Sequence, residues 1–183
     1  MDKRSPAGFT VWFTGLPGAG KSTLSKMLGE KLKQFDLPVQ ILDGDEVRKR
    51  LTKELGFSRE DREENIRRIA YVAKLLTNIG GITIVAAISP YRHSRAEARA
   101  EIKNFVEVFV QCPLQTCIDR DPKGLYAKAT RGDIPNFTGV SDPYEPPEKP
   151  EILVRTDQEK PEECLGRILT TLSELGYISR TIC

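Results

Sequence analysis

Apolar residues along this chain fall into short runs that alternate with longer stretches of helical spacing. Short runs rich in β-branched and aromatic residues predict buried strands at 9–13, 39–42, 82–88, 105–110 and 152–154. Between them, apolar positions recur at three- and four-residue intervals and predict helices at 23–35, 46–54, 58–79, 92–103, 113–120 and 161–175. This alternation predicts an α/β fold: a parallel β-sheet of about five strands flanked by helices, with right-handed crossovers.

Length and composition narrow the class of protein. The chain has 183 residues, which suits one domain spanning 1–183, and its net charge of +2 gives no reason to expect a nucleic-acid or membrane partner. No apolar run reaches the roughly 18 residues that a membrane span needs, and the N-terminus lacks the apolar segment of a secretory signal. The four cysteines have no C-x-x-C spacing and His93 is the single histidine, which argues against zinc. We expect reduced thiols and a cytoplasmic location.

A glycine-rich segment stands between the first predicted strand and the first predicted helix. The run Gly15-Leu16-Pro17-Gly18-Ala19-Gly20-Lys21-Ser22, followed by Thr23, fits the phosphate-loop pattern G-x-x-x-x-G-K-[ST] in full. Glycines let backbone N–H groups turn toward a polyphosphate, and the helix N-terminus adds favourable partial charge. Lys21 is expected to reach the β- and γ-phosphates, and the Ser22 hydroxyl to ligate Mg²⁺. The chain is therefore predicted to bind a nucleoside triphosphate.

The carboxyl ends of the predicted strands supply the other candidate groups. In open parallel sheets the ligand crevice lies beyond these ends. Asp43 and Asp45 follow the second strand, whereas the third strand carries no terminal acid. One aspartate is expected to help order Mg²⁺ and its water, and the other to accept a hydrogen bond from an acceptor hydroxyl. Asp45 as a helix cap is an alternative that is compatible with this role.

Arginines near this edge indicate a second anionic substrate. The apolar stripe of the third predicted helix, extended one turn toward its N-terminus, reaches Arg62, with Asn65 beside it. Arg48 lies one turn into the helix that opens near Asp45, so it can also face the crevice. Arg67 and Arg68 stand at the edge of the stripe, where binding an anion and pairing with Glu63 and Glu64 are both open.

The segment 121–150 breaks the alternation of strands and helices. It holds six of the twelve prolines, three glycines and little periodicity. Long loops without periodicity in compact domains are usually functional or disordered. Basic, aromatic and turn residues occur together here, which favours a mobile lid.

Several motifs together resemble the adenylylsulfate kinase family over about 8–178. They are Asp43-Gly44-Asp45 with Arg48, Gly56-Phe57-Ser58, the run 62–68, Ile88-Ser89-Pro90-Tyr91-Arg92, Lys123-Gly124-Leu125-Tyr126, Phe137-Thr138-Gly139-Val140 and Asp142-Pro143-Tyr144-Glu145-Pro146-Pro147. That family transfers the γ-phosphoryl group of MgATP to the ribose 3′-hydroxyl of adenosine 5′-phosphosulfate. The phosphate loop is shared by many families, but the aspartate pair and lid motifs are far more restrictive.

The resemblance implies roles for residues at matching positions. The acceptor would contact Asp45, Arg48, Phe57, Arg62, Asn65, Ile88, Ser89, Lys123, Asn136 and Phe137, with its adenine between the two phenylalanines. The adenine of ATP would lie near Arg120 and Thr156. Catalysis would involve Lys21, Asp43, Asp45, Ser89 and Lys123, and Mg²⁺ would be held by Ser22 and Asp43. In some relatives the serine matching Ser89 becomes phosphorylated, although direct in-line transfer needs no protein nucleophile.

Two other functions stay open on the residues alone. A kinase for another small anionic acceptor, such as a nucleoside monophosphate, would also use a phosphate loop and an arginine-lined crevice. A non-catalytic ATP-binding domain cut from a bifunctional chain is the third reading, against which Lys21, Ser22, Asp43 and Asp45 argue. The resemblance allows ATP sulfurylase as a partner in the same pathway or chain, and implies a homodimer.

Overall fold

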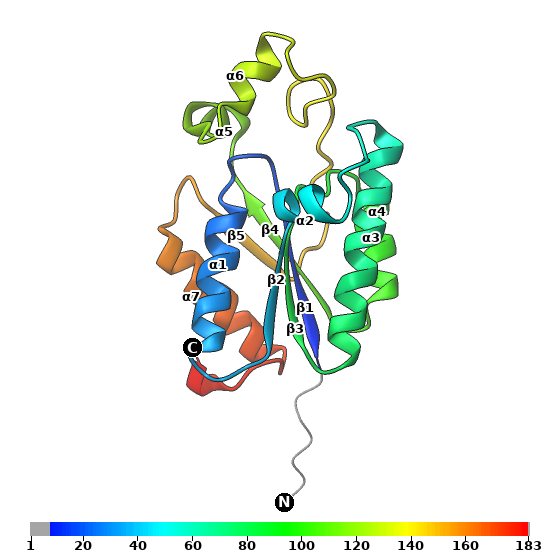
Figure 1. The fold of residues 1–183 in the computed structure, drawn as a ribbon. Helices are drawn as coiled ribbons and strands as arrows, with labels where there is room; N and C mark the ends of the chain where they lie inside the picture. The colour runs from blue at the N-terminus through cyan, green and yellow to red at the C-terminus, as the bar shows by residue number, and fades with distance from the viewer. Residues whose placement is uncertain (1–7, 183) are drawn as a thin grey trace, which may run out of the picture.

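The computed structural model describes residues 8–182, and it has five parallel strands at its centre (Figure 1). The strands are β1 (Phe9–Thr14), β2 (Val39–Asp43), β3 (Ile82–Ala86), β4 (Phe105–Gln111) and β5 (Ile152–Arg155). They lie in the order β2-β3-β1-β4-β5, so β1 is central and Val11 pairs with Ile84 on one side and Val106 on the other. The predicted fold class is confirmed.

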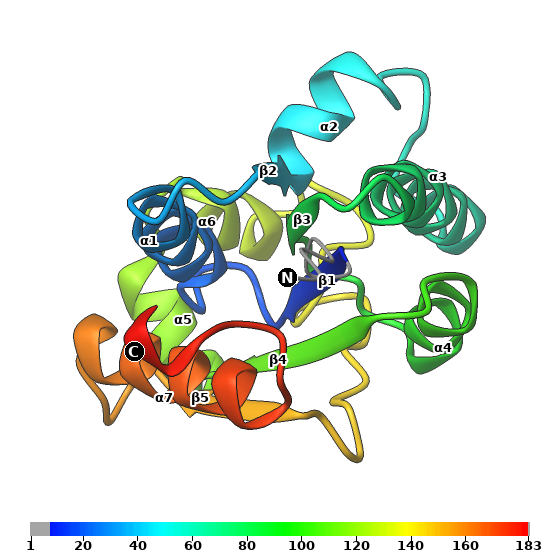
Figure 2. The ribbon, with the colours of Figure 1, turned by 90° about the horizontal axis from the view of Figure 1, so that it is seen from below.

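Helices cover both faces of the sheet. They are α1 (Lys21–Lys33), α2 (Gly44–Arg50), α3 (Arg59–Asn78), α4 (Arg92–Glu101), α5 (Leu114–Arg120), α6 (Leu125–Thr130) and α7 (Pro161–Glu174), followed by a short 3-10 turn, η1 (Arg180–Ile182). Seen along the strands, α1 and α7 pack on one face and α3 and α4 on the other (Figure 2). No helix within residues 8–182 is long and apolar enough to cross a membrane.

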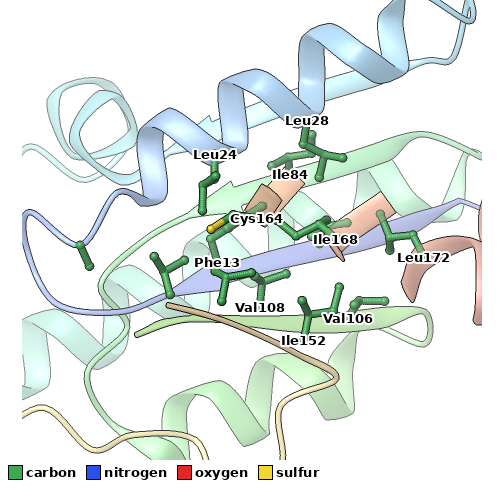
Figure 3. Close-up of a cluster of buried hydrophobic side chains, with 14 of the residues drawn as sticks. Phe13, Leu24, Leu28, Ile84, Val106, Val108, Ile152, Cys164, Ile168 and Leu172 are labelled. Carbon is green, nitrogen blue, oxygen red and sulfur yellow. The ribbon is translucent and has the colours of Figure 1, made fainter. Parts of the chain in front are cut away.

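Each face of the sheet has its own hydrophobic cluster. Under α1 and α7, Phe13 of the central strand belongs to a buried cluster that also holds Leu28 of α1 and Ile168 of α7 (Figure 3). On the opposite face, Trp12 is fully buried and stacks on Phe105 with ring centroids 5.6 Å apart. Adjacent residues of this buried strand therefore contribute to the hydrophobic clusters on opposite faces of the sheet, as expected for a central parallel strand.

Many element boundaries differ from the sequence prediction by one or two residues, and three differences bear on the site. Helix α2 begins at Gly44 and ends at Arg50, earlier at both ends than the predicted range 46–54. Strand β3 ends at Ala86, so Ile88 follows the strand instead of ending it. Within the predicted lid, α6 is a six-residue helix that the sequence pattern did not reveal.

The first part of the segment between α5 and β5, with α6, lies over the carboxyl ends of the strands, and its last residues run down beside the sheet to the start of β5 (Figure 1). The phosphate loop and α2 approach the same edge, because each directly follows a strand. The arrangement agrees with the rule that ligands of open parallel sheets bind beyond these ends.

Candidate active site

A cavity of about 790 Å³ opens at this edge of the sheet. Its volume lies within the usual range of ligand sites, roughly 300–1,000 Å³. The predicted site residues that line it are Pro17, Gly18, Gly20, Lys21, Ser22, Thr23, Asp43, Asp45, Arg48, Phe57, Arg62, Asn65, Ile88, Ser89, Arg120, Lys123, Phe137 and Thr156. The structure thus brings together residues that the sequence spreads over more than 130 positions.

The phosphate loop has the backbone shape that its glycines allow. Gly18 and Gly20 have φ angles of 76° and 104°, which non-glycine residues rarely adopt. Gly20 directly precedes α1, so the first N–H groups of the helix face the cavity. Glycine spacing thus produces an anion-binding turn at a helix N-terminus.

Lys21 is buried beneath this loop. Its Nζ donates hydrogen bonds to the carbonyls of Gly15 at 2.8 Å and Leu16 at 2.7 Å. Burial lowers the pKa of Lys21 to about 8, and the carboxylates of Asp45 and Asp43 offset this only in part. A phosphate group in the cavity would supply the counter-charge that the ammonium group otherwise lacks.

Three predicted loop residues do not line the cavity. Gly15 and Leu16 contribute the carbonyls that hold Lys21, and the carbonyl of Ala19 accepts a hydrogen bond from Thr156 Oγ1 at 2.8 Å. Gly15 also packs so closely on the Val110 carbonyl that a Cβ would lie 2.5 Å from its oxygen. These residues stabilise the conformation of the loop on its side away from the cavity.

Ser22 and Asp43 contact each other at the cavity wall. The Ser22 hydroxyl donates a hydrogen bond of 2.8 Å to Asp43 Oδ2. The other carboxylate oxygen, Oδ1, accepts the backbone N–H of Asp45 at 3.0 Å and so caps α2. The alternative that Asp45 caps this helix is therefore wrong, because the strand ends at Asp43 and the first turn begins directly after it.

The Ser22–Asp43 pair suits Mg²⁺. Alcohol and carboxylate oxygens are the hard donors that this ion prefers, and it usually takes one or two protein ligands together with substrate phosphates and water. Within the described residues, no group of three or more His, Cys, Asp and Glu side chains forms a complete protein cage for a metal. The donor set therefore fits an ion that a polyphosphate helps to hold.

Capping by Asp43 leaves the Asp45 side chain facing the cavity mouth. There its carboxylate forms an ion pair with Lys123, which lies between α5 and α6. Both side chains are more than half exposed. An acceptor hydroxyl and a phosphate group could therefore reach them from the cavity.

Arg48 and Arg62 form the basic side of the cavity. Both guanidinium groups lie over the Phe57 ring, at 4.6 and 5.7 Å from its centroid. Burial and the neighbouring Arg62 charge lower the pKa of Arg48. Two cations this close repel each other, so an anion between them would be stabilised.

Arg62 is almost fully buried and also holds the lid. It donates to the carbonyls of Phe57 and Asn136 and to Thr138 Oγ1, the last at 2.9 Å. The predicted contact of Asn136 with substrate is not supported by its position, because Asn136 does not line the cavity and offers its carbonyl to Arg62. Its φ of 53° turns the chain at this point.

The remaining predicted acceptor contacts lie around the same space. Phe57 is 47% exposed, whereas Phe137 is 8% exposed and packs edge-on against Tyr126 with ring centroids 5.1 Å apart. Asn65 is held at the wall by a 2.7 Å hydrogen bond from Thr52 Oγ1. The two phenylalanines leave aromatic surface on the cavity from different elements, as stacking of a purine requires.

Ser89 is buried, with a φ of 41° in the left-handed region. Its Oγ accepts a hydrogen bond of 3.1 Å from Trp12 Nε1. Neighbouring Ile88 offers its carbonyl to Thr14 Oγ1 at 2.8 Å. Residues of the central strand therefore hold the chain where it leaves β3.

Arg120 and Thr156 meet on the opposite side of the phosphate loop. Arg120 donates to Thr156 Oγ1 at 3.2 Å and to its carbonyl at 2.6 Å. Because Thr156 is bonded to Ala19, this pair is joined to the loop. Both residues line the cavity, and their place beside the ATP adenine stays a prediction.

Arg67 and Arg68 pair with acidic side chains of their own surroundings. Both donate to Glu64, and Arg68 also pairs with Glu54. Neither lines the cavity, so the ion-pair interpretation is the correct one. Glu63 pairs with Arg59 instead.

Sequence reasoning missed several residues that support the site. Tyr126 donates to the Pro17 carbonyl at 2.9 Å, which joins α6 to the phosphate loop. Tyr144 Oη lies 3.0 Å from Thr14 Oγ1, and buried Arg95 contacts Ser89. These contacts join distant parts of the chain, so no local spacing signals them.

The predicted lid has two parts with different support. In the second part, residues 142–147, Asp142 accepts a hydrogen bond from Tyr91 Oη at 2.8 Å. Glu145 bonds to the backbone of Pro90 and of Arg92, at 2.8 Å each. This part is fastened beside the end of β3. The first part, residues 121–137, includes α6 and lines the cavity with several side chains, among them Lys123, which pairs with Asp45, and Tyr126, which bonds to Pro17.

Known proteins that this chain resembles in sequence are described as adenylylsulfate kinases or as bifunctional proteins with such a kinase. The family Adenylylsulphate kinase matches residues 7–155. An adenylyl-sulfate kinase of Gloeothece citriformis is 56% identical over 171 residues, covering 93% of this chain and 97% of the relative. A probable bifunctional SAT/APS kinase of Sorangium cellulosum is 57% identical over 95% of this chain, which spans 30% of that relative.

A solved structure agrees with the sequence relatives. The Mycobacterium tuberculosis APS kinase in complex with AMPPNP and APS superposes with a TM-score of 0.88 at 43% identity, covering 92% of this chain and 99% of that one. The family match, the full-length relatives and the shared fold all agree with the cavity described above. The chain belongs to the adenylylsulfate kinase family.

Proposed function

We propose that this chain transfers the γ-phosphoryl group of ATP to the ribose 3′-hydroxyl of adenosine 5′-phosphosulfate, giving 3′-phosphoadenosine 5′-phosphosulfate. The observation that carries the proposal is one cavity with two separate cationic regions. Lys21 and the α1 N-terminus form one region, and Arg48 with Arg62 forms the other. One triphosphate accounts for the first region only. The identity of the relatives points to adenylylsulfate for the second.

On the ATP side, the chain's own groups would hold and neutralise the phosphates. The backbone N–H groups of the loop would bind phosphate oxygens. Lys21 would replace its two hydrogen bonds to backbone carbonyls with hydrogen bonds to phosphate oxygens. Arg120 and Thr156 would border the adenine. Ser22 and Asp43 would hold Mg²⁺, which when bound would neutralise charge on the β- and γ-phosphates.

On the acceptor side, Arg48, Arg62 and Asn65 would hold the phosphosulfate and ribose. Phe57 and Phe137 would enclose the adenine, and Ile88 with Ser89 would form the end wall. Asp45 would accept the hydrogen bond of the attacking 3′-hydroxyl and so orient it in line with the phosphorus. Lys123, already beside Asp45, would contribute positive charge where the phosphoryl group passes.

A panel of acceptors tests this function. Purified protein with MgATP is incubated with adenylylsulfate or with each of several nucleoside monophosphates, and products are separated by chromatography. We expect a 3′-phosphorylated product from adenylylsulfate only, and none from Lys21→Ala. Efficient transfer to a nucleoside monophosphate would favour the alternative kinase. ATP binding without transfer to any acceptor would favour a non-catalytic domain.

We further propose a homodimer. The outer side of α3 exposes Tyr71, Leu75 and Ile79, spaced four residues apart, and nearby Leu51 is 46% exposed. Apolar side chains gathered on one helix face commonly mark an interaction surface. Light scattering of the wild type and Leu75→Glu tests this, with Lys33→Glu on α1 as a surface control. A monomeric wild type would contradict it.

The proposed setting is a cytoplasmic pathway in which ATP sulfurylase, in the same pathway or the same chain, supplies the acceptor. Cys112, Cys117 and Cys164 are free and buried, which supports a reducing compartment.

A further inference from the structure

Arg95 of α4 is a buried cation that lies outside the cavity and bonds to three separate segments. Its side chain is 3% exposed. Nη1 donates to the Ser89 carbonyl at 2.6 Å, Nε to Glu107 Oε1 at 2.9 Å and Nη2 to the Glu145 carbonyl at 2.7 Å. A single planar guanidinium group thus joins the segment after β3, strand β4 and the second part of the lid.

The Ser89 contact is at a strained point of the backbone. A φ of 41° at a residue other than glycine is uncommon and strained, so surrounding contacts must maintain it. Trp12 bonds to the Ser89 hydroxyl, while Arg95 bonds to its carbonyl. A charge-assisted hydrogen bond is the stronger kind of contact, so Arg95 is well suited to hold this turn.

The Glu145 contact lies at the end of the fastened part of the lid. Arg95 Cζ is 5.8 Å from the centroid of the neighbouring Tyr144 ring, and Tyr144 Oη contacts Thr14 in the central strand. Tyr144 and Glu145 are therefore bound to the same arginine that holds Ser89. Displacing the guanidinium group would remove one contact from each of Ser89, Tyr144 and Glu145 at the same time.

Glu107 balances the buried charge. Its carboxylate is 9% exposed and faces Arg95 at 2.9 Å and Arg99 at 3.5 Å. Arg99 also pairs with Glu151, but its side-chain bonds do not reach Ser89 or Glu145. Arg99 therefore shares the counter-ion of Arg95 without sharing its other contacts.

We propose that Arg95 is a positioning residue of the acceptor site. It holds the Ser89 turn and the 144–145 segment together, and so fixes the wall that Ile88 and Ser89 present to the cavity. It acts on the acceptor through this wall and has no direct contact with it. The proposal rests on the function proposed above, because it assigns that wall to the acceptor.

Arg95→Lys and Arg95→Gln test the proposal, with Arg99→Gln as the matched control. Lysine keeps the charge beside Glu107 but cannot supply three donors in a plane. We expect Arg95→Lys to unfold near the wild-type temperature, and to raise the KM for adenylylsulfate at least tenfold. Its kcat should fall less than threefold and its ATP affinity should stay within twofold. Arg95→Gln should show the same KM effect with a lower unfolding temperature.

Arg99→Gln should leave the acceptor KM within twofold of the wild type. If Arg95→Lys has the acceptor KM of the wild type, or if Arg99→Gln raises it equally, the positioning role is wrong. Arg95→Lys is needed beside Arg95→Gln, because glutamine leaves the Glu107 carboxylate without its closest partner and the protein then can fail to fold.

Hydrogen exchange separates this proposal from the proposed function. The backbone amides of residues 87–92 and 142–147 should exchange faster in Arg95→Lys than in the wild type. In Arg99→Gln their exchange rates should equal those of the wild type. Unchanged exchange in Arg95→Lys would overturn the role of Arg95 whatever the substrate is. Faster exchange in a protein whose wild type does not phosphorylate adenylylsulfate would instead contradict the proposed function, while supporting the contacts of Arg95.

Discussion

Lys123 in the first part of the lid forms an ion pair with Asp45 at the start of α2, across the mouth of the cavity. The two residues are 78 positions apart, and each is proposed to act on a different partner during transfer: Asp45 on the acceptor hydroxyl and Lys123 on the phosphates. In the free protein each side chain thus neutralises the other. Binding of substrates would replace this pair with two new contacts.

Replacing Asp45 should lower turnover without removing ATP binding. Asp45→Asn keeps the shape but loses the proton-accepting carboxylate, and positioned acid–base groups typically contribute 10²–10⁴-fold. We therefore expect kcat to fall at least about 100-fold, with ATP affinity changed less than about threefold. Glu46→Gln is the control, since Glu46 is exposed and pairs only with nearby Arg50. Equal losses in both variants would show that Asp45 has no special role.

The lowered pKa of Lys21 predicts proton uptake when ATP binds. In the free protein burial lowers this pKa to about 8, so the amine is mostly neutral at about pH 9. Phosphate oxygens favour the ammonium form and raise the pKa, so binding at about pH 9 should take up close to one proton. At about pH 7 the uptake should be near zero, because the lysine is already charged.

Titration calorimetry in buffers of different ionisation enthalpy measures this uptake. Lys21→Arg is the control, because arginine keeps its proton at both pH values. If that variant binds ATP and shows the same uptake at about pH 9, another group is the source.

Arg62→Ala should separate the two halves of the cavity. Losing a hydrogen bond to a charged partner costs roughly 1.5–3 kcal/mol, so adenylylsulfate binding should weaken by roughly 10- to 150-fold. ATP binding should change by less than about threefold, as Arg62 contacts Phe57, Asn136 and Thr138 and no residue of the phosphate loop. Calorimetry with each ligand decides it, with Arg59→Ala as a control on the same helix. Equal weakening of both ligands would mean that the two regions are not separate.

How far the sequence predicts this site depends on how local each interaction is. The phosphate loop and the Asp43–Asp45 pair were recognisable because strand, turn and helix follow one another directly. Arg62 was placed correctly because helical periodicity indicates which side of α3 is buried, and it is 7% exposed. These are short-range patterns, which can be recognised in the sequence before the fold is known.

The residues that sequence reasoning missed depend on contacts between distant segments. Arg95 lies in a polar helical stretch, where charge normally indicates a solvated face, yet it is buried because Glu107 and Glu145 come to it from β4 and the lid. Helix α6 has too few residues for periodicity to show. Asp45 was considered as an alternative cap of α2, and the structure gives this role to Asp43, because either aspartate fits the pattern until the end of the strand is known.

Ser89→Ala should keep substantial activity. The Ser89 hydroxyl is buried and already accepts a hydrogen bond from Trp12, so it is poorly placed as a phosphoryl acceptor. Removing it should cost one hydrogen bond, about 0.5–1.5 kcal/mol, seen as a small loss in kcat/KM. Single-turnover reactions with labelled ATP measure this directly. A dead but folded variant would show that a phosphoserine lies on the pathway, since alanine cannot carry the group.

The two parts of the lid should respond differently to ligands. Residues 142–147 are already fastened by Tyr91, Pro90 and Arg92, so their amides should exchange slowly in the free protein. Residues 121–137 make fewer such contacts and should become protected when nucleotides fill both regions, because closure over the cavity excludes water. Hydrogen exchange on the free and doubly liganded protein tests this. Equal protection of 121–137 in both states would mean that this part is a fixed element.

Phe137 is the residue through which acceptor binding is expected to close the lid. Its ring lines the cavity and packs edge-on against Tyr126, so a purine could stack on it without moving the tyrosine. Stacking on a base is worth on the order of 1–3 kcal/mol, so Phe137→Ala should raise the acceptor KM by about 5- to 150-fold. Phe137→Leu is the matched variant: it keeps an apolar side chain beside Tyr126 but offers no aromatic face. If stacking is the main contribution, both variants raise the acceptor KM, whereas a wild-type KM in Phe137→Leu would show that Phe137 acts only by packing within the lid.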